Sequence, residues 1–366
     1  MKRTLISDFT RVVVADDSPF ICRLLTQYLE SDPLVKVVMT VQNGRDALNA
    51  VRELKPDVLT LDLNMPILNG FGALKKIMFE YPISVVLISG VSKKAAQMTK
   101  YGLELGAVDY ILKYIPGKTV PPDCLRSEII AKVKAASMVK AIRPNLSAYT
   151  NSYNKPVADK KTAVLEPDTA RISTTPCKLS HLIIIGASTG GPLAIKELLL
   201  FLNTDFFFPI VIVQHMPDRF TEILAYHLNQ QFSFCVREAF QGEYLAPGVI
   251  LIAPGDRHLI ICPDRSINLS MKPAVNGYRP SIDVTMESAA RVYDLHITGI
   301  LLSGMGTDGA KGLAAIRQNY GTTYAQSKES CVIDIMPYTA IKKGVVQQVG
   351  SPADIARWLN EEFERN

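Results

Sequence analysis

The sequence has few of the features that mark secreted, membrane-spanning or zinc-structured proteins. Its six cysteines are scattered without one Cys-x-x-Cys pair, which argues against a disulfide framework or a zinc site and favours a reducing cytoplasm. No apolar run approaches the roughly 18 residues of a membrane span, so no direct membrane insertion is expected. Asp8 and Arg11 stand where a secretory signal would be apolar, so no signal peptide is predicted.

The chain also lacks a strong charge of one sign. The formal net charge is only +5, and Lys and Arg form no stripe that would indicate nucleic-acid binding. A composition of 48% hydrophobic and 20% charged residues is ordinary for a soluble globular protein. A length of 366 residues favours two or three domains.

Two stretches with alternating strand and helix patterns are separated by a segment without them. Residues 1–142 contain short β-branched runs between helical periodicities, and strands are expected at 12–14, 36–41, 58–61, 85–89 and 110–112. Residues 143–178 are rich in Pro, Ser, Thr and Asn and are interpreted as a linker. In residues 179–366 strands are expected at 182–185, 210–213, 249–252 and 297–302. Both halves are therefore predicted to be α/β domains built on parallel sheets.

Polar residues follow the expected strands of the first half. Asp16 and Asp17 come after the first strand, Asp62 after the third, Ser89 ends the fourth and Lys113 ends the fifth. Each residue alone is best explained as a cap or a turn. Together they meet at the ligand-binding edge of a parallel sheet, where three carboxylates favour a hard cation such as Mg²⁺ and an aspartate can accept a phosphoryl group.

The segments that carry these residues resemble a two-component response-regulator receiver. They are Val14-Ala15-Asp16-Asp17-Ser18, Leu61-Asp62-Leu63-Asn64-Met65-Pro66, Leu87-Ile88-Ser89-Gly90 and Asp109-Tyr110-Ile111-Leu112-Lys113. The resemblance implies a flavodoxin-like (βα)5 domain with Asp62 as phosphoacceptor and a histidine kinase as phosphodonor.

The same resemblance assigns the remaining polar residues. Asp17, Asp62 and the Asn64 carbonyl would bind the Mg²⁺ needed for phosphorylation, with Asp16 assisting. Ser89 and Tyr110 would form the receiver switch together with Lys113. The sequence departs from the family at Tyr114, where a proline usually follows the lysine, so a different loop geometry is expected there.

A glycine-rich turn follows the first strand of the second half. Gly186-Ala187-Ser188-Thr189-Gly190 matches G-x-S-x-G, the pattern of a serine nucleophile between a strand and a helix. A dinucleotide site would need glycine in place of Ser188 and an acid after the next strand. That strand instead ends in Gln214-His215, so the nucleotide interpretation is rejected.

A base and an orienting carboxylate are expected at neighbouring strand ends. The five histidines are His181, His215, His227, His258 and His296. His215 directly follows a strand, whereas His227 lies within an expected helix and His258 is a candidate to line the cleft. Asp308 lies in the glycine-rich turn after residues 297–302. By itself Asp308 would be read as a helix cap, but it completes a Ser-His-Asp set.

The order Ser188, His215, Asp308 differs from that of α/β-hydrolases, in which the acid precedes the histidine. It resembles that of the chemotaxis protein-glutamate methylesterases, as do the motifs Gly-Ala-Ser188-Thr-Gly-Gly, Gln-His215-Met-Pro, Ala-Pro-Gly255-Asp-Arg-His258, Arg279-Pro-Ser-Ile-Asp283 and Ser-Gly-Met305-Gly-Thr-Asp308-Gly-Ala. The resemblance implies a doubly wound, mostly parallel catalytic domain without a cofactor.

The resemblance also gives each matching residue a role. Ser188 would be the nucleophile, His215 the general base and Asp308 its partner. Met305 and Thr189 would form the oxyanion hole. Arg279 and Asp283 would shape the substrate groove.

The implied activity is phosphorylation-activated hydrolysis of glutamate methyl esters on the cytoplasmic helices of chemoreceptors. Members of this family can also deamidate receptor glutamines by the same chemistry. Two other classes were considered. One is a non-catalytic binding module gated by the receiver, and the other is a DNA-binding response regulator, which the missing helix-turn-helix pattern disfavours.

Overall fold

The computed structural model describes residues 9–90, 92–113, 122–138, 180–218, 220–292 and 296–364. The chain divides into two compact units, residues 1–163 and 164–366, and each is described by itself. The predicted linker, 143–178, and Tyr114 lie outside the described residues. Among the helices described, none combines the length and the apolar character that a bilayer crossing requires.

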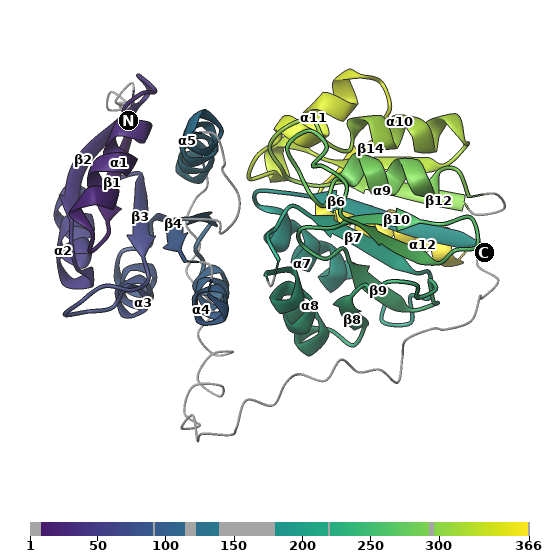
Figure 1. The fold of residues 1–366 in the computed structure, drawn as a ribbon, viewed down its shortest axis with the longest axis horizontal. Helices are drawn as coiled ribbons and strands as arrows, with labels where there is room; N and C mark the ends of the chain where they lie inside the picture. Colours follow the sequence, from purple (N-terminus) through teal and green to yellow (C-terminus); the bar gives the residue numbers. More distant parts are fainter. Residues whose placement is uncertain are drawn as a thin grey trace, which may run out of the picture. The chain divides into compact units, whose positions relative to one another are not determined.

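The first unit is built on a five-stranded parallel sheet in the order β2-β1-β3-β4-β5 (Figure 1). Its strands are β1 (Thr10–Ala15), β2 (Val35–Val41), β3 (Val58–Asp62), β4 (Ser84–Ser89) and β5 (Asp109–Leu112). Every residue of β3 and β4 is buried, as expected for central strands covered on both faces. This strand order is that of flavodoxin-like folds, so the predicted fold class is confirmed.

Helices connect these strands. They are α1 (Pro19–Leu29), α2 (Gly44–Leu54), α3 (Gly70–Glu80), α4 (Lys93–Glu104) and α5 (Pro122–Met138). Helix α1 begins as the sequence predicts, because Ser18 accepts a hydrogen bond from the Ile21 amide and Pro19 occupies the first turn. Helix α1 packs against α5, and α2 packs against α3.

The second unit contains a seven-stranded parallel sheet in the order β14-β13-β12-β6-β7-β9-β8. The strands are β6 (His181–Ala187), β7 (Ile210–Gln214), β8 (Cys235–Glu238), β9 (Val249–Ile252), β12 (His296–Leu301), β13 (Thr322–Gln326) and β14 (Gln348–Gly350). A separate antiparallel pair consists of β10 (His258–Ile261) and β11 (Ile267–Ser270). Strands β8, β10, β11, β13 and β14 were not predicted, because they are short and carry polar residues.

Within the described residues of this unit, six α-helices cover the two faces of the sheet (Figure 1). Helices α9 (Ile282–Ala289), α10 (Ala310–Gln318) and α11 (Ile335–Lys342) contribute to one hydrophobic core. Helices α7 (Gly191–Phe201), α8 (Phe220–Gln231) and α12 (Pro352–Glu364) contribute to the other. This is the doubly wound arrangement that the sequence predicts.

The position of β6 determines where the polar loops meet. Strand β6 is buried at all seven positions and lies between β12 and β7 in the sheet. All three strands are parallel, so their carboxyl ends share one edge. The loops that follow them carry Ser188, His215 and Asp308.

Candidate active site and receiver site

His215 and Asp308 form a direct pair at the carboxyl edge of the second sheet. His215 Nε2 lies 2.8 Å from Asp308 Oδ2, although the two residues are 93 positions apart in sequence. The His215 amide also donates to the Ala187 carbonyl at 3.0 Å. The end of β6 therefore holds the backbone of the histidine, while the loop after β12 orients its ring.

The Asp308 carboxylate is completely buried and surrounded by donors. Besides His215, the Ser281 hydroxyl donates at 2.8 Å, the Ile282 amide at 2.7 Å and the Asp283 amide at 3.1 Å. Burial by itself would raise the pKa of Asp308, but the hydrogen bond and charge of His215 and these further donors hold it below its ordinary value. The carboxylate therefore stays ionised and can orient an imidazole.

Hydrogen bonds from neighbouring strands fix the backbone of Ser188. Its amide donates to the Ser303 carbonyl at 3.0 Å, and its carbonyl accepts from the Gln214 side-chain amide at 2.8 Å. Gly190 has φ +77°, a left-handed conformation that favours glycine. A Cβ on Gly191 would lie 2.1 Å from Gln214 Oε1. These glycines allow the turn to leave β6 and enter α7 directly behind the serine.

The tautomer of His215 follows from its partner. Because Asp308 is an ionised acceptor, Nε2 carries the ring proton, and Nδ1 is left as the acceptor nitrogen. Nδ1 is buried and has no hydrogen-bond partner in the described part of the chain. The ring therefore keeps one nitrogen whose lone pair is not used by a hydrogen bond among the described residues.

Thr189 and Met305, predicted to form an oxyanion hole, are held through their carbonyl groups. The Thr189 carbonyl accepts from the Ser303 hydroxyl at 2.8 Å, and the Met305 carbonyl accepts from the Tyr278 hydroxyl at 3.3 Å. Among the described residues neither of their amides has a hydrogen-bond acceptor. Both backbone N–H groups are therefore available to a ligand.

Tyr278 is a site residue that the sequence analysis missed. Its ring stacks on that of His215, with centroids 3.8 Å apart and planes inclined by 6°. Its position beside the Arg279-Pro-Ser-Ile-Asp283 motif was the only available signal, because stacking leaves no pattern in a single sequence.

His258 supports Asp308 through Ser281, a contact that the sequence did not predict. His258 is buried, and its Nδ1 accepts from the Ser281 amide at 3.2 Å while Nε2 lies 3.1 Å from the Pro273 carbonyl. His258 therefore positions the serine that donates to Asp308. Ser281 lies inside a motif quoted from the sequence, so it could have been found there.

Arg279 and Asp283 bind protein groups near the site. The buried Asp283 side chain accepts from the Gly312 amide at 2.8 Å and from Asn276 at 3.2 Å. Burial, together with the negative charge of Asp308, raises the pKa of Asp283 to about 6. Arg279 donates to the carbonyls of two residues in the loop after β11, at 3.0 and 3.1 Å. These contacts hold the loop between β11 and α9 and link α9 to α10.

The acidic residues of the first unit also gather at the carboxyl edge of their sheet. Oxygen atoms of Asp16, Asp17 and Asp62 lie within 4.8 Å of one another. Lys113 Nζ is 2.9 Å from Asp16 Oδ2 and 2.9 Å from Asp62 Oδ2. Asp16 and Asp62 are buried, whereas Asp17 is exposed. An all-oxygen donor set with one open side fits a hard divalent cation that keeps several waters.

The charge balance of this cluster is incomplete without a cation. Burial raises the pKa of Asp62 above its ordinary range, and the Lys113 ammonium lowers it only in part. The Asn64 amide donates to Asp62 Oδ1 at 3.2 Å, which fixes the carboxylate and places the Asn64 backbone beside it. A cation at Asp16, Asp17 and Asp62 would complete the neutralisation.

Ser89 is the last residue of β4, and Tyr110 is the second residue of β5. The Thr99 hydroxyl donates to Ser89 Oγ at 2.5 Å, and Ser89 Oγ donates to the Gly90 carbonyl at 3.0 Å. The Tyr110 side chain is buried, with the Lys132 ammonium 5.1 Å from its ring centroid. The two residues predicted as a switch thus lie on adjacent strands of one sheet.

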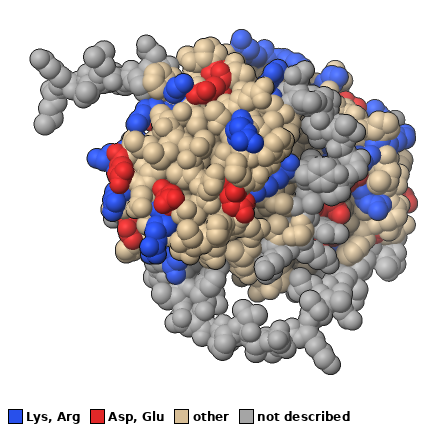
Figure 2. Space-filling model, turned by 60° about the vertical axis from the view of Figure 1, so that its left-hand side comes forward, with Lys and Arg blue, Asp and Glu red and all other residues tan. Residues whose placement is uncertain are grey.

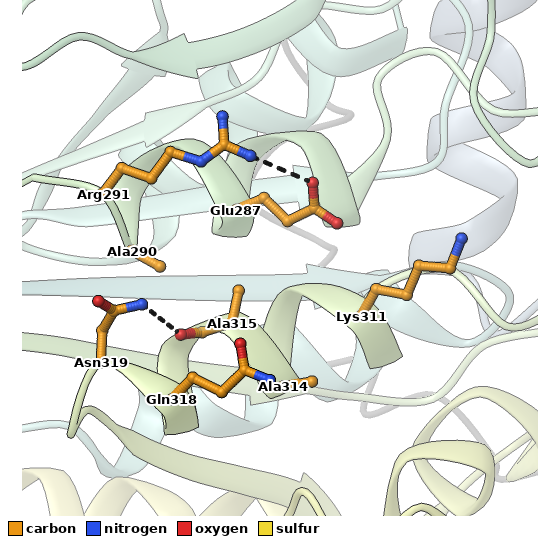
Figure 3. A pocket seen from close by; sticks show the side chains of 8 residues that line it. All are labelled: Glu287, Ala290, Arg291, Lys311, Ala314, Ala315, Gln318 and Asn319. Atoms are coloured by element: carbon orange, nitrogen blue, oxygen red, sulfur yellow. Dashed lines mark hydrogen bonds and ion pairs between the residues drawn. The ribbon is translucent and has the colours of Figure 1, made fainter.

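Two surface features lie apart from these sites. On the face in Figure 2, basic and acidic side chains are interspersed. A pocket of about 370 Å³ lies between α9 and α10 and is lined by Glu287, Ala290, Arg291, Lys311, Ala314, Ala315, Gln318 and Asn319 (Figure 3). In the described part of the chain none of these residues forms a hydrogen bond or ion pair with His215 or Asp308, and Arg291 and Glu287 pair at 3.9 Å.

Comparisons with known proteins agree with this geometry. Residues 12–120 match the family of response regulator receiver domains, and residues 183–359 match the CheB methylesterase family. The chain is 38% identical over 343 residues to the protein-glutamate methylesterase/protein-glutamine glutaminase of Symbiobacterium thermophilum, covering 93% of each chain. The chain belongs to the family of protein-glutamate methylesterases/protein-glutamine glutaminases.

Other members of this family show comparable similarity. The enzyme of the same description from Methanococcus maripaludis is 36% identical over 356 residues, covering 94% of this chain and 95% of its own. The crystal structure of the Thermotoga maritima CheB methylesterase catalytic domain is 36% identical and covers 51% of this chain and 100% of its own, with a TM-score of 0.49. Similarity to the methylesterase family thus extends over receiver and catalytic units alike.

Proposed function

We propose that this protein is a phosphorylation-activated protein-glutamate methylesterase that removes methyl groups from glutamate side chains on chemoreceptor helices during sensory adaptation. The observation that carries the proposal is the 2.8 Å pair between His215 Nε2 and Asp308 Oδ2, with Ser188 in the loop of the adjacent strand. A docking module without chemistry would not need an oriented imidazole whose second nitrogen is unpartnered.

The geometry supports acyl transfer through a covalent intermediate. His215 Nδ1 takes the proton of Ser188 as the serine oxygen attacks the ester carbonyl carbon. The amides of Met305 and Thr189 stabilise the oxyanion of the tetrahedral intermediate. The bond to the methoxy group then breaks, His215 returns the proton, and methanol leaves. Water attacks the acyl-enzyme in the same way and releases glutamate and free Ser188.

Glutamine deamidation follows from the same residues. The amide carbonyl of a glutamine side chain presents the same group to Ser188, and His215 protonates the departing ammonia in place of methanol. Both reactions form one acyl-enzyme and need no metal or cofactor in the catalytic unit. The family name covers both activities.

Regulation is assigned to the receiver. Asp62 is the phosphoacceptor for a chemotaxis histidine kinase. Asp16, Asp17 and Asp62 would hold Mg²⁺, which would supply charge neutralisation for phosphoryl transfer. Lys113, already 2.9 Å from Asp62, then pairs with the phosphoryl group. Ser89 and Tyr110 report the new charge to the rest of the receiver, which relieves inhibition of the catalytic unit.

The domain organisation proposed with this function is a receiver in residues 1–142, a linker in 143–178 and a catalytic domain in 179–366. A location in the cytoplasm fits the receptor helices and the kinase as partners. Neither nucleic-acid binding nor membrane insertion has a part in the mechanism.

Methanol release from methylated receptor membranes tests the proposal. Wild type, Ser188→Ala and Asp62→Asn are compared with and without a small-molecule phosphodonor. We expect no release above background with Ser188→Ala, and basal release without stimulation with Asp62→Asn. Undiminished release by Ser188→Ala would overturn the esterase assignment, whereas stimulation of Asp62→Asn would overturn only the phosphoacceptor assignment.

A further inference from the structure

Two histidines and a glutamate lie close together at the amino ends of β6 and β12, whereas the candidate active site lies at the carboxyl ends of the same strands. His181 is the first residue of β6, and His296 is the first residue of β12. The two are directly paired in the sheet register, and their ring centroids lie 4.8 Å apart. Glu362, in the last turn of α12, reaches both imidazoles from the covering helix layer.

The distances between these groups match a metal coordination sphere. Glu362 Oε1 is 3.7 Å from His181 Nε2 and 3.5 Å from His296 Nε2, and the three ligand atoms all lie within 4.8 Å of one another. Tetrahedral coordination at about 2.0–2.1 Å separates neighbouring ligand atoms by about 3.3 Å. Movements of a few tenths of an ångström would bring the two N···O distances to this value, and the two imidazole nitrogens, within 4.8 Å of each other, would have to approach as the ion binds.

The surrounding residues orient the ligands. Phe208 stacks on the His181 ring, with centroids 4.4 Å apart and planes inclined by 16°, and His181 Nδ1 lies 3.4 Å from Ser180 Oγ. The Thr298 hydroxyl lies 3.5 Å from Glu362 Oε2, the carboxylate oxygen that does not face the imidazoles. Hydrogen bonds to the outer atoms of metal ligands are the usual means of fixing a tautomer and a ring orientation.

We propose that His181, His296 and Glu362 bind a divalent first-row transition-metal ion of the zinc class. Two imidazoles and one carboxylate suit this class better than Mg²⁺ or Ca²⁺, which prefer oxygen ligands. Three protein ligands leave a fourth position for water. Thr322 Oγ1 lies 3.0 Å from His296 Nε2, and binding of the ion at Nε2 would displace this contact and leave the hydroxyl to hydrogen-bond the water. The ion would tie the end of α12 to the sheet, far from Ser188.

The alternative to a bound metal ion is protonation of one of the two histidines, which would then form an ion pair with Glu362. Zn²⁺ titration of the full-length protein after EDTA treatment and dialysis separates the two, with Mg²⁺ present throughout. We expect His296→Gln and Glu362→Gln each to bind one Zn²⁺ fewer than wild type. If a variant keeps the site, its affinity for that Zn²⁺ should be lower by a factor on the order of 100. His227→Gln, the same change on helix α8, should behave as wild type.

A Co²⁺ titration gives an independent reading of the ligands. Wild type and His227→Gln should develop visible d–d absorption that His296→Gln and Glu362→Gln lack, with circular dichroism confirming that all variants are folded. His296 is the most exposed of the three ligands, so its variant is the least disruptive. Equal Zn²⁺ stoichiometry and affinity in all four proteins would overturn the proposal, whether or not the protein is a methylesterase.

Discussion

The ring of Tyr278 lies flat against the imidazole of His215, with centroids 3.8 Å apart, and its hydroxyl donates to the Met305 carbonyl at 3.3 Å. One side chain therefore contacts both the proposed base and the loop of the proposed oxyanion hole. We assign Tyr278 as a positioning residue, because it restricts the imidazole plane without reaching the ester itself.

Substitutions at Tyr278 should separate its two contacts. Tyr278→Phe keeps the stacked ring and loses one hydrogen bond worth about 1 kcal/mol, so kcat should fall roughly fivefold. Tyr278→Ala frees the imidazole, and a displaced catalytic group costs on the order of 100-fold in kcat. Steady-state methanol release, with KM determined separately, provides the measurement. Equal losses in the two variants would show that stacking contributes nothing.

Glu238 should make the stability of the catalytic unit depend on pH. Burial, together with Glu222 and Asp218 nearby, raises the pKa of Glu238 from 4.5 to about 7. The folded state then binds this proton more tightly than the unfolded state. The free energy of unfolding should therefore fall by about 3 kcal/mol as the pH rises from about 4.5 to about 7.

Glu238→Gln should remove this pH dependence and make the protein more stable than wild type at pH values above about 7. Urea unfolding at several pH values, monitored by a probe in the catalytic unit such as Trp358, measures the difference. Glu361→Gln, at an exposed position of α12, is the matched control and should follow wild type. A wild-type slope that persists in Glu238→Gln would contradict the assignment.

Asp62 and Lys113 should have opposite effects on the stability of the receiver. Burial raises the pKa of Asp62, so its ionised form destabilises the fold above its ordinary pKa, and Asp62→Asn should stabilise the receiver at neutral pH. Lys113→Met leaves two buried carboxylates without their cation and should cost roughly 2–4 kcal/mol. Thermal unfolding of the full chain without divalent cations measures both effects. If Asp62→Asn lowered the stability of the receiver more than Lys113→Met does, the opposite effects assigned to these two residues would be wrong.

Gly191→Ala should distort the turn behind Ser188. The added Cβ would lie 2.1 Å from Gln214 Oε1 and 2.8 Å from Ala187 Cβ, so Gln214 must give up its bond to the Ser188 carbonyl. We expect methanol release to fall at least about tenfold, because Ser188 moves relative to His215. Gly242→Ala meets no atom within 4 Å but places alanine at φ +81°, so it should lower stability by about 1 kcal/mol while retaining activity. Similar activities in both variants would contradict the role given to this turn.

The parts of the structure that local patterns specify were predictable from the sequence. Buried β-branched runs located β1, β3, β6 and β7, and residues that follow buried strands indicated the acidic cluster. The Ser-His-Asp set was found by the same reasoning, since parallel strands bring their carboxyl ends to one edge. The order of the three residues then pointed to the family, and the family resemblance supplied the role of each residue.

The contacts that cross between distant segments were not predictable. Tyr278 stacks on a residue of another loop, and His258 acts on Asp308 only through Ser281. Such contacts depend on how the β10–β11 pair and α9 pack beside the main sheet. Neither hydrophobic periodicity nor turn chemistry in one sequence carries that information. The effect of Tyr114 remains a prediction, because this residue lies outside the described part.

The arrangement of β12, β6 and β7 has a consequence for refolding. Ser188, His215 and Asp308 come from three strands whose pairing closes long loops of chain, and the entropy of closing long loops makes such pairings slow. Isolated helices and early hairpins cannot assemble this site. Recovery of methylesterase activity after dilution from denaturant would therefore report the docking of the central three strands, while far-ultraviolet signals recover earlier.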